Sequence, residues 1–409
     1  MNNLLLKTTC ITLFLFPFLP YIKEFNFILG NIIELSLICV IIIINICSNL
    51  KKINKVVFFQ MIIILFFILF LLINIRSKNL SDGLSALRIY IEPFIIGISF
   101  TNIYVKFGKS GITKILSTIL LSVLIICILG IIQFIFPDII LKIRPSGMYK
   151  VLRPKSDFIS LSVYNRVMSI MNDPNVYSVF LVVIYPIVDL LKYSNDKFFK
   201  RIYLYKLLII TNIILTNSRQ GMILILFYII ISKFINRYLH EFSNIIINLK
   251  LILKYIINTI ILILTILNID KIINSVLEIF RIDTLHNLNG REDKNTIVKK
   301  MLFDRDFIYI LFGNGLNTGR EFIFENSFNL IISQVGIIGI FIVIFVYFIF
   351  YKSFPIKSKG FIKREYIYIL TFIILMYSGD YILIPQVSIY FFIVVFSLVL
   401  FENKNIHLN

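Results

Sequence analysis

The sequence predicts an all-α polytopic membrane protein with about twelve transmembrane helices. Hydrophobic residues make up 58% of the chain and charged residues 15%, and the mean hydropathy is +0.91. No stretch of ordinary mixed composition exceeds roughly 60 residues, whereas a soluble domain needs on the order of 100. We therefore expect residues 1–409 to form a single integral membrane domain.

Apolar runs long enough to cross a bilayer as helices recur along the whole chain. The expected spans are 4–22, 30–48, 56–75, 88–105, 113–136, 174–192, 202–217, 220–236, 251–269, 329–350, 366–383 and 386–401. The span at 202–217 and the last two are short, so a count between about 11 and 13 is compatible with the pattern.

Every second connection between these spans is short and rich in lysine and arginine. The basic connections are 50–55, 106–114, 192–201, 233–254 and 351–365. Short basic loops stay in the cytoplasm. This orientation places both termini in the cytoplasm and the other connections on the periplasmic side.

Two of the periplasmic connections are long, at 137–173 and 270–328. Within the longer one, residues 294–312 mix apolar and charged residues in a helical pattern, which predicts an amphipathic helix at the membrane interface. The glycines of FGNGLNTG (312–319) are expected to end that helix. A third connection, TNSRQG (216–221), is tight.

Composition also excludes several classes of function. The net charge is +19, but the basic residues lie between apolar runs rather than along one face, so we predict no nucleic-acid partner. The four cysteines lie in apolar runs without CxxC spacing, and the three histidines are far apart. The sequence therefore predicts no metal site and no cofactor.

Arginines gather on the side that is expected to face the periplasm. They are Arg144, Arg153, Arg166, Arg219, Arg291 and Arg320. Arginine binds phosphate oxygens bidentately and keeps its charge, so this set suits a lipid-linked phosphate or diphosphate. Headgroup anchoring and salt bridges within the loops are the alternative. Arg219 stands out because it lies in a tight turn between two spans, where an unpaired charge is unfavourable.

A second set of polar residues precedes the span at 329–350. Glu325 and Asn326 end the long loop, and a carboxylate there can act as a general base toward a sugar hydroxyl. The alternative is an acidic residue favoured by the helix dipole. Gly336 and Gly339 would let another helix pack closely.

The entry to the span at 174–192 carries a third set. Asn172 or Asp173 is expected to cap this helix, with Pro174 in its first turn. Asn175 and Tyr177, one turn into the membrane, are expected to line a polar cavity.

Three acidic residues lie at apparent membrane depth: Glu34, Glu92 and Asp189. Such groups usually face a cavity or a partner. Arg88 and Glu92 are four residues apart and are expected to pair on one helix. Asp189 lies near the cytoplasmic end of its span.

Several landmarks, in this order, resemble the O-antigen polymerase and O-antigen ligase superfamily of bacterial membrane glycosyltransferases. They are MNDPNVYS (171–178), LTNSRQG (215–221), NGRED (289–293), FGNGLN (312–317) and ENSFNLIISQVGIIG (325–339). The resemblance covers roughly residues 144–345, together with the span count and the inside termini. It implies a GT-C-like fold with a large periplasmic loop over a cavity open to the periplasm.

The resemblance also implies a chemistry. Its substrates are oligosaccharide repeat units on undecaprenyl diphosphate, and no metal is needed. Arg219 and Arg291 match arginines associated with the lipid diphosphate. Asn326, Gly336 and Gly339 fit the pattern of the ligases, but Glu325 stands where ligases have histidine, which favours a polymerase.

The resulting expectation is a metal-independent surface-polysaccharide polymerase of the bacterial inner membrane, active at its periplasmic face. Its expected catalytic residues are Arg219, Arg291 and Glu325, and its expected substrate-binding residues are Arg144, Arg153, Arg166, Asn175, Tyr177, Asn326 and Arg320. Membrane lipids and a chain-length regulator protein are the further expected partners. The alternatives are a ligase acting on lipid A–core, a flippase or transporter of lipid-linked oligosaccharides, and a peptidoglycan polymerase.

Overall fold

The computed structural model is predominantly helical in the part of the chain that it describes. The described residues are 2–49, 54–75, 80–136, 166–171, 173–191, 202–242, 307–316, 327–353 and 384–402. Helices occupy every predicted span except 251–269 and 366–383, which lie outside these residues. The chain divides into two compact units, Met1–Leu226 with Arg305–Asn409, and Phe227–Asp304.

The first membrane span of the chain consists of three short helical elements. They are α1 (Asn2–Leu15), the 3-10 turn η1 (Phe16–Phe18) and α2 (Leu19–Phe25). Pro17 and Pro20 each stand in the first turn of their piece, where a missing N–H removes no helical hydrogen bond. This span is therefore interrupted near its two prolines and is still long enough to cross a bilayer.

Two further apolar helices follow. They are α3 (Phe27–Asn49) and α4 (Lys55–Ile73). Asn54 caps α4, because its side chain accepts a hydrogen bond from the backbone N–H of Val56 at 2.9 Å. Many large apolar side chains on α3 and α4 are exposed, including Phe27, Phe66 and Ile73. A bilayer covers such surfaces, which is what the composition predicts.

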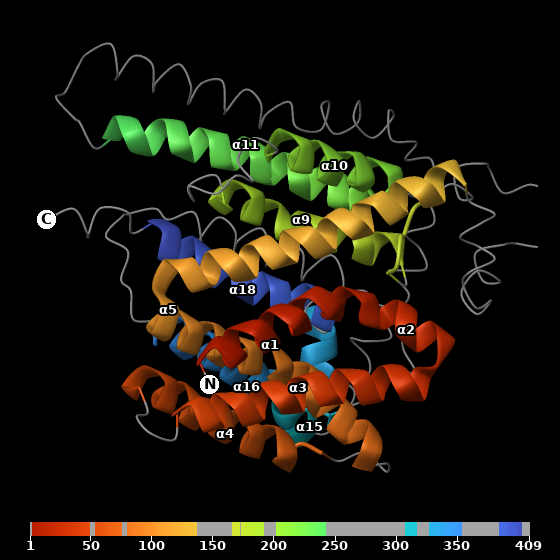
Figure 1. Ribbon diagram of the computed structural model, residues 1–409. Helices are drawn as coiled ribbons and strands as arrows, with labels where there is room; N and C mark the ends of the chain where they lie inside the picture. Colours follow the sequence, from red (N-terminus) through yellow and green to blue (C-terminus); the bar gives the residue numbers. More distant parts are fainter. Residues whose placement is uncertain are drawn as a thin grey trace, which may run out of the picture. The chain divides into compact units, whose positions relative to one another are not determined.

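The helix α5 (Leu80–Ile135) contains two helices joined at Gly108. This glycine has φ 60° and ψ −149°, a conformation that only glycine adopts readily. The chain turns back there (Figure 1). The predicted spans 88–105 and 113–136 are thus the two halves of α5.

The remaining helices complete the described chain. They are α9 (Pro174–Leu191), α10 (Ile202–Leu215), α11 (Arg219–Phe242), α15 (Phe307–Phe312), α16 (Ser327–Lys352) and α18 (Pro385–Glu402). α9 is enclosed by other helices, with nearly all its side chains buried and with contacts to α5, α10 and α18. Figure 1 shows α9 and α10 beside the second half of α5, and both helices contact α5.

An aromatic cluster forms the core where α4, α5, α16 and α18 meet. The ring of Phe94 lies 4.8–5.5 Å, between centroids, from the rings of Phe67, Tyr347, Phe350 and Phe392, in edge-to-face geometry. Such contacts are favourable for aromatic rings and hold helices together where lipid replaces water.

Among the described residues, six helices are long and apolar enough to cross a membrane, and three more apolar helices are shorter. One of the six is the 50-residue Ala86–Ile135, which contains both halves of α5. In the described residues the predicted all-α class is therefore confirmed, with six candidate membrane-spanning helices as expected for a polytopic membrane protein. The count of twelve spans, the orientation and the GT-C-like fold stay predictions.

Candidate functional site

Arg166 joins three segments that are separate in the sequence. Its Nε donates to the backbone carbonyl of Thr216 at 3.0 Å, and its Nη2 donates to Oδ1 of Asn175 at 2.8 Å. Arg166 is the first described residue of a non-helical segment, 166–171, that precedes α9 in the chain. Two residues that the sequence assigned to substrate binding, Arg166 and Asn175, are thus in direct contact.

The start of α9 orients Asn175. Asp173 caps the helix, because its Oδ1 accepts from the backbone N–H groups of Asn175 at 2.6 Å and Val176 at 3.3 Å. The predicted cap is confirmed for Asp173, while Asn172 lies outside the described residues. Because Oδ1 of Asn175 accepts from Arg166, the amide nitrogen of Asn175, which can only donate, points away from the guanidinium.

The tight connection between α10 and α11 is also confirmed. The backbone N–H of Ser218 donates to Oγ1 of Thr216 at 3.1 Å, and that of Gly221 donates to Oγ of Ser218 at 3.4 Å. Asn217 adopts a positive φ of 48°, which asparagine tolerates better than most residues. Arg219 is exposed and is the first residue of α11. Arg166 therefore binds the same turn that presents Arg219.

Tyr177 lies deeper, in the packing between helices. Its side chain is fully buried, and its hydroxyl donates to Oδ1 of Asn212 at 3.0 Å. Gly130 makes room for this contact, because a Cβ there would lie 2.3 Å from Oδ1 of Asn212. The structure thus shows Tyr177 joining α9 to α10, and its expected contact with substrate stays a prediction.

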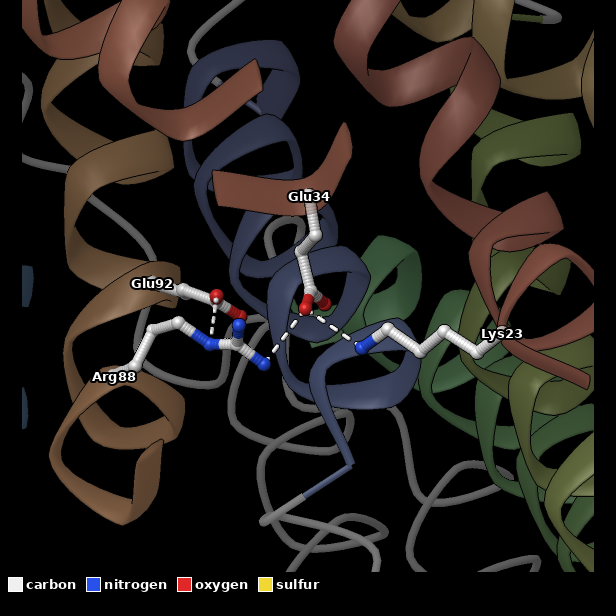
Figure 2. Close-up of polar contacts among 4 residues, drawn as sticks. All are labelled: Lys23, Glu34, Arg88 and Glu92. Carbon is white, nitrogen blue, oxygen red and sulfur yellow. Dashed lines mark hydrogen bonds and ion pairs between the residues drawn. The ribbon is translucent and has the colours of Figure 1, made fainter. Parts of the chain in front are cut away.

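Two buried carboxylates are held by two cations near the ends of α2, α3 and α5. Glu34 and Glu92 have no exposed side-chain surface. Nζ of Lys23 lies 2.7 Å and Nη2 of Arg88 2.6 Å from Oε2 of Glu34, and Nε of Arg88 lies 3.0 Å from Oε1 of Glu92. In Figure 2 Arg88 stands between the two carboxylates, with Lys23 on the far side of Glu34.

The pairing of Arg88 with Glu92 is the one that the sequence predicts, and it is confirmed. The contact of Arg88 with Glu34 and that of Lys23 with Glu34 were not predicted. Gly30 is the residue in the sequence that could have indicated the contact between Lys23 and Glu34. A Cβ at Gly30 would lie 2.4 Å from Cγ of Lys23, so the lysine side chain crosses the glycine to reach Glu34, one turn further along α3.

Asp189 pairs with Lys206 across α9 and α10, and Nζ of Lys206 also lies 5.4 Å from the ring centroid of Tyr185. Both partners of this ion pair are partly exposed. The pair lies at the end of α9 remote from Asn175, and we assign it to helix packing.

The turn after α15 docks onto a break in α16. Gly336 has φ 70° and ψ −174°, which interrupts α16. The backbone N–H of Asn314 donates to the carbonyl of Ser333 at 2.8 Å, and that of Gly315 donates to the carbonyl of Gln334 at 3.0 Å. The landmark FGNGLN thus supplies partners for carbonyls at the break in α16, as buried non-helical backbone requires.

Glycine is needed on both sides of this contact. A Cβ at Gly336 would lie 2.2 Å from the carbonyl oxygen of Leu311, and a Cβ at Gly313 would lie 2.5 Å from the carbonyl of Gln334. The sequence predicted that Gly336 and Gly339 would admit a neighbouring helix. For Gly336 the neighbour is the end of α15 and its turn.

No family model matches this chain, and neither does any curated protein or solved structure.

The other predicted site residues lie outside the described part of the chain. They are Arg144, Arg153, Arg291, Arg320, Glu325 and Asn326. Within the described ranges, no group of three or more histidine, cysteine, aspartate or glutamate side chains is arranged to hold a metal ion.

The junction formed by Arg166, Asn175 and the turn at Arg219 is rich in hydrogen-bond donors. Arginine donates only, and the amide nitrogen of Asn175 also only donates. The N-terminus of α11 adds the positive end of a helix dipole at Arg219. Such an arrangement suits an anionic oxygen-rich ligand such as a phosphate.

Proposed function

We propose that this protein is a metal-independent membrane glycosyltransferase of the O-antigen polymerase type. It moves a growing glycan from undecaprenyl diphosphate onto a lipid-linked repeat unit at the periplasmic face of the inner membrane. The observation that carries the proposal is the junction at Arg166. It joins the end of the 137–173 connection to the turn that bears Arg219, two segments that the charge pattern places on the same side of the membrane.

Transfer to a sugar hydroxyl requires one bond to form and one to break. The hydroxyl oxygen of the acceptor forms a bond to the anomeric carbon of the donor glycan, while the bond from that carbon to the diphosphate oxygen breaks. The lipid diphosphate leaves with the electron pair, and the hydroxyl proton passes to a base. Fixed donors that face the leaving oxygen lower the barrier, because they need no reorganisation as charge develops.

The described residues supply donors for that leaving group. Arg219 binds the donor diphosphate and Arg166, held by Thr216 and Asn175, supplies a second guanidinium nearby. Under the proposal Arg291 joins them, and Glu325 accepts the hydroxyl proton or holds the acceptor sugar. Arg144, Arg153, Arg320 and Asn326 contact the second lipid-linked substrate.

A cellular experiment tests the reaction. In cells that lack this protein, lipid A–core bearing a single repeat unit should accumulate. Complementation with Arg219→Ala or Arg166→Ala should leave long chains absent from a chain-length ladder, with the protein still in the membrane. Lys206→Met is the matched control, because it also removes a cation that contacts a neighbouring helix, here through the ion pair with Asp189, but Lys206 lies away from the junction. Unligated polymer in the deletion would instead identify a ligase.

A binding experiment tests the ligand directly. Purified protein in lipid nanodiscs should bind undecaprenyl diphosphate more tightly than undecaprenol, which lacks the phosphates. Removing a charged hydrogen bond by Arg219→Ala should weaken binding of the diphosphate about ten- to a hundredfold and leave that of undecaprenol unchanged. Equal affinity of the wild-type protein for both lipids would refute the proposal.

A further inference from the structure

The segment that carries Arg166 is buried although it is not helical. Residues Val167 to Met171 are each at most 5% exposed. Backbone N–H groups in such a place need partners, because neither lipid nor an apolar core can supply them. The N–H of Val167 donates to the carbonyl of Leu215 at 3.1 Å, and that of Met171 donates to the carbonyl of Met168 at 2.9 Å.

One side chain satisfies two of the three N–H groups between them, those of Met168 and Ser169. Gln133, in the last turn of α5, is 3% exposed. Its Oε1 accepts from the backbone N–H of Met168 at 3.1 Å and from that of Ser169 at 2.7 Å. An amide oxygen has two lone pairs, and Gln133 uses both on this segment. A third bond to α5 runs from Oγ of Ser169 to the carbonyl of Ile126 at 2.7 Å.

The conformation that these bonds hold is one that the chain does not favour by itself. Ser169 has a positive φ of 51°, which is uncommon for a residue with a side chain. Arg166 lies only two residues before Met168, so a shift of the Gln133 contact moves the Cα of Arg166. The guanidinium reaches Thr216 and Asn175, which belong to other elements, only while that Cα stays in place.

We propose that Gln133 is a positioning residue: by clamping the backbone at Met168 and Ser169, it fixes the guanidinium of Arg166 before the lipid diphosphate binds. This inference rests on the proposed function for the ligand, but the clamp itself is independent of it. Gln133→Met keeps the length of the side chain and removes the acceptor. Gln133→Glu keeps oxygen acceptors at the same position and is the matched variant.

The first measurement reports the clamp without any ligand. Met168→Cys is introduced into a chain whose four native cysteines are replaced by alanine, and its reaction with a water-soluble maleimide is timed. Met168 is 1% exposed, so the introduced cysteine should react slowly. Gln133→Met should speed the reaction at least about tenfold, and Gln133→Glu should restore slow labelling. An unchanged rate in Gln133→Met overturns the inference.

The second measurement asks whether Gln133 acts through Arg166. Affinity for undecaprenyl diphosphate is measured for Gln133→Met, Arg166→Ala and the double variant. Each single variant should bind about tenfold or more weakly, and the double variant should bind no more weakly than Arg166→Ala, because contacts in one network are not additive. If the loss of affinity in the double variant equals the product of the losses in the two single variants, Gln133 has a separate structural effect and the positioning role is overturned.

The two measurements separate the two ideas. If the wild-type protein does not prefer undecaprenyl diphosphate to undecaprenol, the proposed function falls. The maleimide rates alone then test whether Gln133 holds the backbone at Met168 and Ser169. Fast labelling in Gln133→Met, but not in the wild-type background or in Gln133→Glu, would support that role.

Discussion

Gly336→Ala tests the docking of the turn after α15 onto the break in α16. Two separate penalties are expected. The backbone at Gly336 has φ 70° and ψ −174°, a region that costs a residue with a Cβ about 1–3 kcal/mol. In addition, the new Cβ would lie 2.2 Å from the carbonyl oxygen of Leu311, far inside van der Waals contact, so the turn must move away.

Movement of the turn weakens the two hydrogen bonds that Asn314 and Gly315 donate to α16. Each is worth about 0.5–1.5 kcal/mol, so the displacement adds about 1–3 kcal/mol to the strain. Gly108→Ala is the matched control. Gly108 has φ 60° and ψ −149°, in the same region, but no atom lies within 4 Å of its Cβ position. It should therefore show the strain alone.

The assay is equilibrium unfolding of the purified protein in mixed micelles, with helicity followed as the fraction of denaturing detergent rises. Gly336→Ala should lower the free energy of unfolding by about 1–3 kcal/mol more than Gly108→Ala does. Equal losses for the two variants would mean that the contact between the turn and α16 contributes nothing to stability, and the argument from crowding would fail.

Three further predictions use the same assay. Arg88→Met leaves Glu92 without its cation and Glu34 with one cation fewer, and should destabilise the protein by about 3–5 kcal/mol. Lys206→Met, at a partly exposed ion pair, should lower the free energy of unfolding by roughly 1 kcal/mol or less. Similar losses for the two variants would contradict the idea that an unpaired buried carboxylate is costly. Gly30→Val should push Lys23 away from Glu34 and destabilise by about 1–3 kcal/mol, and it should cost less once Lys23 is Met, since no ion pair is then left to lose and only the crowding against Cγ and the backbone of residue 23 remains. Asn102→Leu removes the bonds to Asn45 and Ser48 between α3 and α5 and should lose about 1 kcal/mol, the usual size for such bonds between membrane helices; no change would show that the bonds contribute nothing.

The sequence predicts the helices well because their boundaries depend on local features. The expected span 174–192 is found as Pro174–Leu191, with Asp173 as its cap, and 386–401 is found as Pro385–Glu402. Apolar runs, prolines and capping residues act within a few residues of themselves, so one sequence is enough to read them.

Contacts between helices are a different matter. Arg88 and Glu92 lie one turn apart, and their pairing was predicted. Lys23 reaches Glu34 across the turn between two helices, and Arg166 finds a backbone carbonyl 50 positions away at Thr216. Backbone donors and acceptors leave no trace in side-chain chemistry, so neither the carbonyl of Thr216 nor the N–H groups that Gln133 binds could be identified from the sequence.

The two buried carboxylates and their two partly exposed cations also bear on how the chain enters the membrane. Lys23 and Glu34 belong to one helical hairpin, and Arg88 and Glu92 to one helix, so each pair is neutral before the two meet. A lone charge costs roughly 2.5–3.5 kcal/mol at the centre of an inserting helix. Only the contact between Arg88 and Glu34 requires both segments to be present. Each segment can therefore leave the insertion machinery with its charges already compensated, and the last contact forms when the segments assemble in the lipid.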